Sequence, residues 1–290
     1  FHGRLLFNVP MSDYTSFSVG GMADVMACPM DEDDLRKLLH FAECKGFPIY
    51  VLGAGTNLLV KDGGIRGIVL NLSEGFRDIV FKGEDSLEVG AGVGLSKVVT
   101  ICKDKGFSGL EFAVGIPGSV GGAVAMNAGA YGGEMKDVVE SVEIMERSGK
   151  VRFIQGSNIG FSYRGSKLPD GAVILRVRLA FKRCNVEEVE KKMIKYKAMR
   201  KKTQAMNMPN AGSIFKNPGG ESAGILIEEA GLKGMRCGGA KISEVHANYI
   251  VNLGDANAGD ILALIARARD EVYQLKGIVL EPEIKVIGED

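Results

Sequence analysis

The sequence lacks the cysteine and histidine spacings of metal sites and disulfide frameworks. Its five cysteines, an odd number, stand far apart and form no CxxC pair, at Cys28, Cys44, Cys102, Cys184 and Cys237. The three histidines, His2, His40 and His246, show no HExxH spacing. We therefore expect free thiols in a reducing compartment and no bound metal. His246 lies in an apolar stretch, which favours a structural role over a catalytic one.

Net charge and long apolar runs are also absent. The chain has 36 basic and 36 acidic residues, so no overall basic field points to nucleic acid or to an anionic membrane. No run approaches the roughly 18 apolar residues of a membrane helix. Residues 1–13 lack the features of a secretory signal. We expect a cytoplasmic protein with no nucleic-acid or membrane partner.

Glycine, by contrast, is abundant and concentrated in residues 109–133, GLEFAVGIPGSVGGAVAMNAGAYGG. This stretch holds eight of the 40 glycines in 25 residues, with Phe112, Ile116 and Val124 among the apolar residues between them, so it is no flexible linker. Glycine permits positive φ and a close approach to the backbone. The stretch is either a loop whose N–H groups cradle an anionic ligand or a buried cluster of tight turns, and composition favours neither.

A second glycine-rich turn, GAGTNLL at residues 53–59, follows a predicted strand at 47–52. Its N–H groups, hydroxyl and amide can cradle a phosphate. The turn lacks the third glycine of a Rossmann fingerprint, and no acidic residue stands out about 20 positions later. The chain also has no GxxxxGK[ST] loop.

Hydrophobic periodicity predicts alternating groups of helices and short strands. We expect helices at 31–45, 95–105, 186–202, 222–230 and 260–274, and strands at 47–52, 68–72, 79–81, 87–89, 138–145, 151–154, 172–181, 248–252 and 278–287. This order indicates an α+β chain without the regular βαβαβ rhythm of a doubly wound sheet. A length of 290 residues favours two lobes over one.

Two of these predicted elements carry charge. The helix at 186–202 has an inward stripe of Val186, Val189, Met193 and Tyr196, and its basic end, around Arg200, is expected to be a solvated face. The strand at 278–287 places Glu281 and Glu283 on one face, either as protection of a sheet edge or as a working carboxylate.

Seven blocks stand in order over nearly the whole chain. They are TSFSVGG (15–21), LGAGTNLLVKDGG (52–64), GLEFAVGIPGSVGGAVAMNAGAYGGE (109–134), YRGSKL (163–168), NAGSIFKNP (210–218), GGAKISEVHANYIVN (238–252) and LEPEIKVIG (280–288). Together they resemble the UDP-N-acetylenolpyruvoylglucosamine reductase family, flavoenzymes of bacterial peptidoglycan precursor synthesis. The resemblance implies an FAD-binding fold of the vanillyl-alcohol oxidase and p-cresol methylhydroxylase type, with a smaller α/β substrate-binding lobe.

The resemblance also implies domain boundaries. The FAD-binding domain would cover residues 1–183, in subdomains at about 12–70 and 71–183. The substrate-binding domain would cover 184–277, and the C-terminal strand at 278–290 would return to the FAD-binding part. The family's implied partner is a small molecule, a UDP-sugar enolpyruvyl ether, and we expect a monomer.

The chemistry implied by the resemblance needs three residues. NADPH reduces non-covalent FAD, and the enolpyruvyl group then receives a hydride from flavin N5 at C3 and a proton at C2. Ser213 matches the family's proton donor, and Arg164 and Glu283 match the pair that stabilises developing charge. Without the motif, Ser213 reads as a turn or capping hydroxyl and Arg164 as a surface ion pair.

The same resemblance assigns the binding residues. Tyr163, Lys216 and Asn217 match substrate contacts, and no metal ligand is implied. The FAD contacts are Gly53, Ala54, Gly55, Thr56, Asn57, Leu58, Gly115, Ile116, Pro117, Gly118, Ser119, Gly121, Gly122, Asn127, Gly129 and Ala130. We expect residues 115–122 to face the cofactor and 127–133 to extend toward the flavin ring.

The chain resembles the shorter branch of the family, because residues 181–192 leave little room for a tyrosine-bearing loop over the substrate diphosphate. The basic end of the helix near Arg200 is one candidate to replace that loop. Two other functions are weighed against the reductase: an oxidase of the same flavin superfamily that acts on an alcohol or a sugar, and a non-catalytic nucleotide-binding protein that retains the fold.

Overall fold

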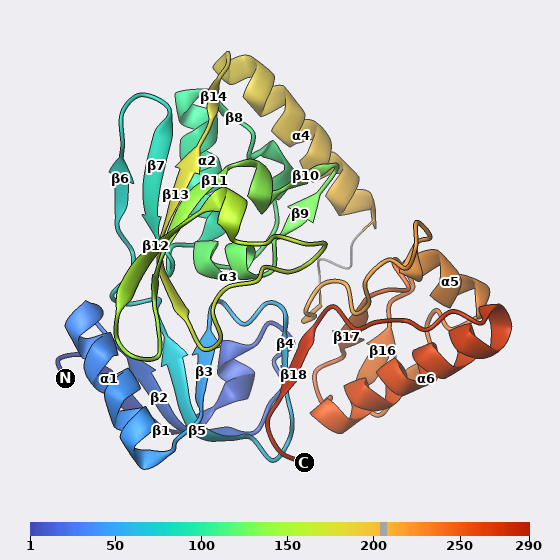
Figure 1. The fold of residues 1–290 in the computed structure, drawn as a ribbon. Coiled ribbons are helices and arrows are strands. Elements are labelled where there is room, and N and C mark those ends of the chain that lie inside the picture. Colours follow the sequence, from blue (N-terminus) through green and yellow to red (C-terminus); the bar gives the residue numbers. More distant parts are fainter. Residues whose placement is uncertain (204–207) are drawn as a thin grey trace. The chain divides into compact units, whose positions relative to one another are not determined.

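The computed structural model describes residues 1–203 and 208–290, which form two compact units (Figure 1). Unit 1 consists of Phe1–Phe7, Val25–Ala54 and Gly67–Arg200. Unit 2 consists of Asn8–Asp24, Gly55–Arg66 and the described part of Lys201–Asp290. Each unit is therefore assembled from three separate segments of the chain.

The limits of these units differ from the predicted domain boundaries at residues 183 and 277. Helix α4 (Val186–Thr203) lies in unit 1 as far as Arg200, because Val189 and Met193 pack into the core of that unit. The segment predicted to return to the FAD-binding part, 278–290, lies in unit 2. Val186 is 41% exposed and does not belong to the inward stripe.

A five-stranded antiparallel sheet of order β12-β11-β13-β7-β6 forms the centre of unit 1. Its strands are β6 (Ile79–Phe81), β7 (Ser86–Gly90), β11 (Val139–Met145), β12 (Val151–Gln155) and β13 (Val173–Ala180). All five were predicted to within two residues at each end. A second sheet has the order β1-β2-β5-β3. It contains β1 (Arg4–Pro10), β2 (Met22–Cys28), β3 (Ile49–Leu52) and β5 (Ile65–Asn71), of which β1 and β2 were not predicted.

Capping residues mark several helix ends in unit 1, including those of α3, which was not predicted. Helix α1 (Glu32–Lys45) begins after Asp31, whose carboxylate accepts a hydrogen bond from Asp34 N–H, and ends at Gly46 with φ of 70°. Helix α2 (Leu95–Lys105) ends in the same way at Gly106. Helix α3 (Val120–Ala125) begins after Ser119, whose hydroxyl accepts from Gly122 N–H.

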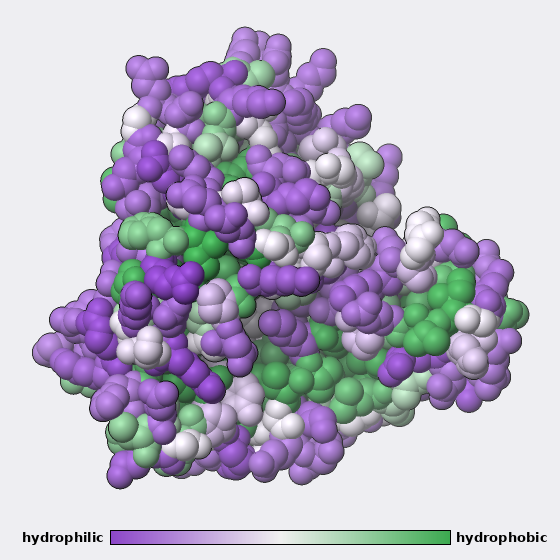
Figure 2. All heavy atoms as spheres, in the orientation of Figure 1, coloured by the Kyte–Doolittle hydropathy of each residue, from purple (hydrophilic) through white to green (hydrophobic). Residues whose placement is uncertain are grey.

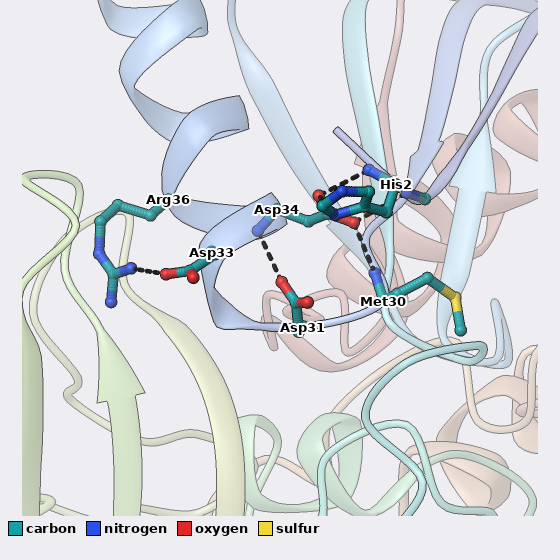
Figure 3. A network of polar contacts seen from close by, with 7 residues as sticks. His2, Met30, Asp31, Asp33, Asp34 and Arg36 are labelled. Carbon is teal, nitrogen blue, oxygen red and sulfur yellow. Dashed lines mark hydrogen bonds and ion pairs between the residues drawn. The ribbon is translucent and has the colours of Figure 1, made fainter.

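Asp34 ties the first residues of the chain to the start of α1 (Figure 3). Its fully buried carboxylate accepts hydrogen bonds from the backbone N–H groups of His2 and Gly3, both at 2.8 Å, and of Met30 at 3.3 Å. Burial raises the pKa of this carboxyl, but the three N–H donors outweigh burial and hold the pKa below its usual value. The acidic first turn of α1 therefore anchors the N-terminal segment as well as capping the helix.

Unit 2 has a separate apolar core. Phe17 and Leu59, from its two short segments, pack with Ile214, Phe215 and Ile261 from its long one. Strand β4 (Leu58–Val60) pairs in parallel with β18 (Lys285–Ile287), and β15 (Arg236–Cys237), β16 (Ala240–Ile242) and β17 (Ile250–Asn252) form an antiparallel sheet. Helices α5 (Ala223–Glu229) and α6 (Ala258–Lys276) pack against each other and match the predicted helices.

The predicted strand at 278–287 is wrong for residues 278–284. Regular strand begins only at Lys285. Pro282 has no N–H and forms an isolated bridge with Phe215, so this segment pairs with the chain around Ile214 by single contacts before it joins β4.

Short elements connect these parts. They are β8 (Phe107–Ser108), β9 (Gly129–Ala130), β10 (Gly133–Glu134) and β14 (Lys182–Arg183), with 3-10 turns η1 (Met11–Tyr14), η2 (Glu111–Ala113), η3 (Met135–Asp137) and η4 (Gly156–Asn158). Within the described residues, no helix is both long and apolar enough to cross a bilayer. Figure 2 shows a face on which hydrophilic residues predominate and apolar residues gather in separate patches.

Candidate active site

The glycine-rich stretch at 109–133 is a folded segment of unit 1 that contains η2, α3 and β9. Gly121 N–H donates to Ala91 O at 2.9 Å, and Val120 N–H donates to Val93 O at 2.8 Å. Gly118 O accepts from Leu95 N–H at 2.9 Å. Residues 118–121 are therefore hydrogen-bonded along the turn that leads into α2. These bonds fix the conformation of the glycine-rich loop.

The two glycine-rich turns meet within unit 1. A Cβ atom on Gly53 would lie 2.7 Å from Ser119 Oγ, and the Cα of Gly122 is within 4 Å of the same position. Gly115 and Gly118 have φ of 75° and 135°, which side chains disfavour. Glycine at position 53 thus lets the two turns pack directly on each other. A Cβ on Gly122 would meet only the Ser119 hydroxyl, so the backbone there is open to a bulky cofactor that approaches closely.

The second half of the GAGTN turn belongs to unit 2. Gly55 has φ of 65°, and a Cβ atom there would lie 1.9 Å from Tyr14 O. Ser16 N–H donates to Gly55 O at 3.0 Å. Only glycine fits at position 55, because Tyr14 and the first residues of the TSFSVGG block pack directly on it.

Alanine substitutions at the neighbouring residues Gly121 and Gly122 can distinguish an effect on folding from an effect on cofactor binding. A Cβ on Gly121 would lie 2.8 Å from Ala91 Cβ, whereas one on Gly122 would meet only the Ser119 hydroxyl, at 3.3 Å. We expect Gly121→Ala to destabilise the apoprotein by about 1–3 kcal/mol through overpacking. Gly122→Ala should keep apoprotein stability within about 1 kcal/mol, because alanine favours a helix, and should weaken FAD binding by about tenfold or more. Denaturant unfolding and FAD titration of the apoproteins measure the two effects.

Gly121 is among the residues expected to contact FAD, but a side chain added there would meet Ala91. Wild-type FAD affinity in Gly122→Ala would contradict the assignment of residues 115–122 to the cofactor.

Arg200 is buried, and the prediction of a solvated basic face is wrong for this residue. It is 8% exposed, and its Nη1 donates to Gly115 O at 3.3 Å. Its guanidinium carbon lies 5.9 Å from the centre of the Tyr131 ring, which stacks on Tyr196 with centroids 4.6 Å apart. The C-terminal end of α4 therefore contacts the glycine-rich stretch at two places, Gly115 and Tyr131.

Arg164 lies at the tip of a tight turn in unit 1. Its φ of 58° is left-handed, and Ser162 and Gly165 exchange backbone hydrogen bonds of 2.9 and 3.2 Å around it. Its guanidinium carbon lies 5.0 Å from the centre of the Tyr163 ring. Ser166 Oγ donates to Ala125 O at 3.0 Å, which ties the turn to α3.

Asn127 supports the same turn. It is completely buried, and its amide nitrogen donates to Ser162 O at 3.0 Å and to Glu134 Oε2 at 2.9 Å, while its Oδ1 accepts from Lys136 N–H at 3.0 Å. We predicted Asn127 to contact FAD, but its side chain is committed to protein groups. Its backbone φ of 41° is left-handed, like that of Arg164.

Unit 2 brings Ser213 and Glu283 together, although they are 70 positions apart. Glu283 N–H donates to Ile214 O, next to Ser213, at 2.7 Å, and Glu283 O accepts from Asn57 Nδ2 at 3.1 Å. Asn57 O also accepts from Lys285 N–H at 3.0 Å. Asn57 of the GAGTN turn thus fixes the backbone that follows the predicted carboxylate, and the Ser213 segment fixes the backbone that precedes it.

Asn248 is a residue that the sequence reasoning missed. It is buried, its Oδ1 accepts from Phe215 N–H at 2.9 Å, its Nδ2 donates to Phe215 O at 2.8 Å, and its backbone O accepts from Ile214 N–H. It therefore holds the Ser213 segment from the side opposite Glu283. A polar residue inside the apolar run HANYIVN was the available signal.

The other predicted residues divide between the units. Lys216 Nζ lies 2.5 Å from Glu281 Oε1, and the Asn217 side chain accepts from Ala223 N–H at 3.0 Å, at the start of α5. Unit 2 also holds Thr56 and Leu58, and unit 1 holds Ala54, Ile116, Pro117, Gly129, Ala130 and Tyr163. His246 accepts a hydrogen bond from Asn248 N–H on Nδ1, and burial lowers its pKa, which fits a neutral structural histidine.

Comparisons with known proteins identify both parts of the chain. Residues 23–155 match the FAD binding domain family, and residues 204–287 match the C-terminal domain family of UDP-N-acetylenolpyruvoylglucosamine reductase. A curated UDP-N-acetylenolpyruvoylglucosamine reductase from Caldanaerobacter subterraneus subsp. tengcongensis is 44% identical over 99% of this chain and 95% of its own length.

Solved structures agree. The crystal structure of UDP-N-acetylenolpyruvylglucosamine reductase from Thermus caldophilus superposes with a TM-score of 0.86 at 40% identity, over 98% of each chain. A solvent-stable cholesterol oxidase matches with a TM-score of 0.50 at 13% identity, over 61% of this chain and 38% of its own. The second likeness concerns the fold alone. Together with the family matches, these findings confirm the predicted α+β, FAD-binding fold.

Proposed function

Because this chain belongs to the UDP-N-acetylenolpyruvoylglucosamine reductase family and is an FAD-dependent oxidoreductase, we propose that it uses NADPH to reduce the enolpyruvyl group of UDP-N-acetylglucosamine enolpyruvate. The product is UDP-N-acetylmuramate, a peptidoglycan precursor. A cytoplasmic location and a monomeric state remain predictions from the sequence.

The residues present fit the cofactor. The backbones of Gly53 and Gly122 lie together in unit 1, with only the Ser119 hydroxyl near a Cβ on Gly122, and Gly55 and Asn57 continue the same turn in unit 2. When bound, FAD supplies at N5 the hydride that it receives from NADPH and that C3 of the substrate accepts. The protein must then stabilise negative charge on C2 and its carboxylate and deliver a proton to C2.

One observation carries the proposal: Ser213 and Glu283 are neighbours across the hydrogen bond from Glu283 N–H to Ile214 O. This bond makes the backbones of two distant blocks of the sequence neighbours, and these blocks carry the hydroxyl and the carboxylate of the proposal. Ser213 is proposed to protonate C2. Glu283 and Arg164 are proposed to stabilise the charge that develops on the substrate, with Arg164 donating to its carboxylate. Tyr163, Lys216 and Asn217 are proposed substrate contacts.

Anaerobic reduction of the flavin tests this function. The purified protein should be yellow, lose its visible flavin absorbance on addition of NADPH, and recover it when UDP-N-acetylglucosamine enolpyruvate is added. UDP-N-acetylglucosamine, which lacks the enolpyruvyl group, is the control and should leave the flavin reduced.

Two outcomes point to the alternatives. Fast reoxidation by oxygen after reduction by an alcohol or a sugar would indicate an oxidase. Bound FAD that NADPH does not reduce would indicate a non-catalytic nucleotide-binding protein.

A further inference from the structure

The turn that carries Arg164 has an unfavourable backbone and no regular secondary structure around it. A non-glycine residue at positive φ costs about 1 kcal/mol or more and persists only where neighbouring contacts hold it. The turn itself offers the two Ser162–Gly165 hydrogen bonds, and a long cationic side chain stands at its tip. Its support must therefore come from outside the turn.

That support comes from the glycine-rich stretch. Asn127 uses both amide hydrogens and its carbonyl oxygen at once, on Ser162 O, on Glu134 Oε2 and on Lys136 N–H. A buried amide with every one of these bonds satisfied has one orientation. The carbonyl it holds, Ser162 O, is also the acceptor that closes the Arg164 turn from Gly165 N–H.

Glu134 completes the arrangement. Its carboxylate accepts from Asn127 and pairs with Lys136 Nζ at 2.7 Å, and its N–H donates to Asp137 Oδ2 at 2.8 Å. The hydrogen bond from Lys136 lowers the pKa of Glu134, and the donation from Asn127 and the positive charge of Arg164 add to that effect. Glu134 is therefore an anion held by both Asn127 and Lys136.

We infer that Asn127 and Glu134 are positioning residues that hold the Arg164 turn in its left-handed conformation. Asn127 fixes the carbonyl that closes the turn, and Glu134 fixes Asn127. The consequence for catalysis rests on the proposed function, whereas the consequence for the turn does not.

Hydrogen exchange of the apoprotein tests the effect on the turn without any substrate. In Asn127→Ala, the amides of Ser162 and Gly165 should exchange about tenfold faster or more than in the wild type. Asn71→Ala is the matched control, since Asn71 is another buried asparagine of unit 1 that bonds Ser73 N–H. It should leave those two amides unchanged. Unaltered exchange in Asn127→Ala would overturn the inference, whatever the enzyme's substrate.

Half-reaction kinetics test the consequence for catalysis. Asn127→Ala should keep FAD content and flavin reduction by NADPH within threefold of wild type, and should slow flavin reoxidation by the enolpyruvyl nucleotide about thirtyfold or more. Loss of FAD with normal reoxidation of the remaining holoenzyme would mean that Asn127 binds the cofactor and would overturn the positioning role. If the wild type itself shows no reoxidation, the proposed function fails, and hydrogen exchange alone decides the inference.

Asn127→Asp gives a signature that loss of packing alone would not give. The new carboxylate would face two acceptors, Glu134 and Ser162 O, with Lys136, Asp137 and Arg164 as the other charges nearby. Its protonated form can donate one hydrogen bond again. The reoxidation rate relative to wild type should therefore rise as the pH falls, and a pH-independent ratio would count against the inference. If Asn127→Ala does not fold, Glu134→Gln keeps an acceptor for Asn127 and should still slow reoxidation selectively.

Discussion

Replacing Ser213 with alanine is expected to leave FAD reduction by NADPH nearly intact and to slow reduction of the enolpyruvyl nucleotide by about a hundredfold or more. Loss of a positioned general acid typically costs a factor of roughly 10²–10⁴. Hydride addition at C3 leaves a strongly basic carbon at C2, so even the weakly acidic serine hydroxyl suffices when it is held on the correct face. Stopped-flow measurement of the two half-reactions separates these steps.

The structure explains why this variant should keep its fold. The Ser213 segment is held through backbone groups, by Asn248 O and Glu283 N–H at Ile214, and none of these bonds uses the serine hydroxyl. The control is Ser243→Ala in the same unit, where the hydroxyl accepts from Val245 N–H at 3.1 Å. It should cost about 1 kcal/mol of stability with both half-reaction rates unchanged. If reoxidation survives unchanged in Ser213→Ala, another group is the acid.

Replacing Arg164 is expected to have an effect of similar size by a different route. Removal of one donor from developing oxyanion charge costs a factor of roughly 10²–10³. We expect Arg164→Ala and Arg164→Gly each to lower kcat/KM for the enolpyruvyl nucleotide by about a hundredfold or more. Arg164→Lys should recover only part of this loss, because an ammonium lacks the planar pair of donors.

The glycine variant separates conformation from chemistry. Arg164 has φ of 58°, so Arg164→Gly should be more stable than Arg164→Ala by about 1 kcal/mol, while both lose activity equally. Arg152→Ala is the control, since Arg152 pairs with Glu146 on the β11–β12 hairpin of the same unit. Its kcat/KM should stay within twofold of wild type. Activity of Arg164→Gly close to wild type would exclude a role for the guanidinium.

The elements predicted best from the sequence are those whose ends are marked by residues close by in the chain. Helices α1 and α2 end at Gly46 and Gly106, where the αL conformation stops them, and these glycines are visible in the sequence. The strand predicted at 278–287 failed because its partners, β4 and the segment around Ile214, lie far away in the chain. Strand pairing of that kind is decided by tertiary contacts that periodicity does not contain.

The residues of the candidate site also differ in how well the sequence could predict them. Ser213, Arg164 and Glu283 came from motif resemblance, because a lone hydroxyl or guanidinium carries no local signal of its role. The supporting residues, Asn127 and Asn248, became evident only with their partners, since buried asparagines look like ordinary turn formers in a sequence. Arg200 was assigned to solvent because helix periodicity cannot show that Gly115 O and Tyr131 lie beside it.

The three-segment construction of unit 2 sets an order of events during synthesis. Val60 pairs with Ile287, and Asp62 caps α6 by accepting from Ala258 and Gly259 N–H at 2.8 and 3.0 Å. A ribosome that adds roughly 5–20 residues per second needs roughly 10–45 s to make the intervening residues. During that time, the apolar Leu58–Val60 segment has been synthesised but its partner strand, Lys285–Ile287, has not. A fragment containing only the C-terminal family domain, residues 204–287, would lack the Leu58–Val60 strand with which Lys285–Ile287 pairs.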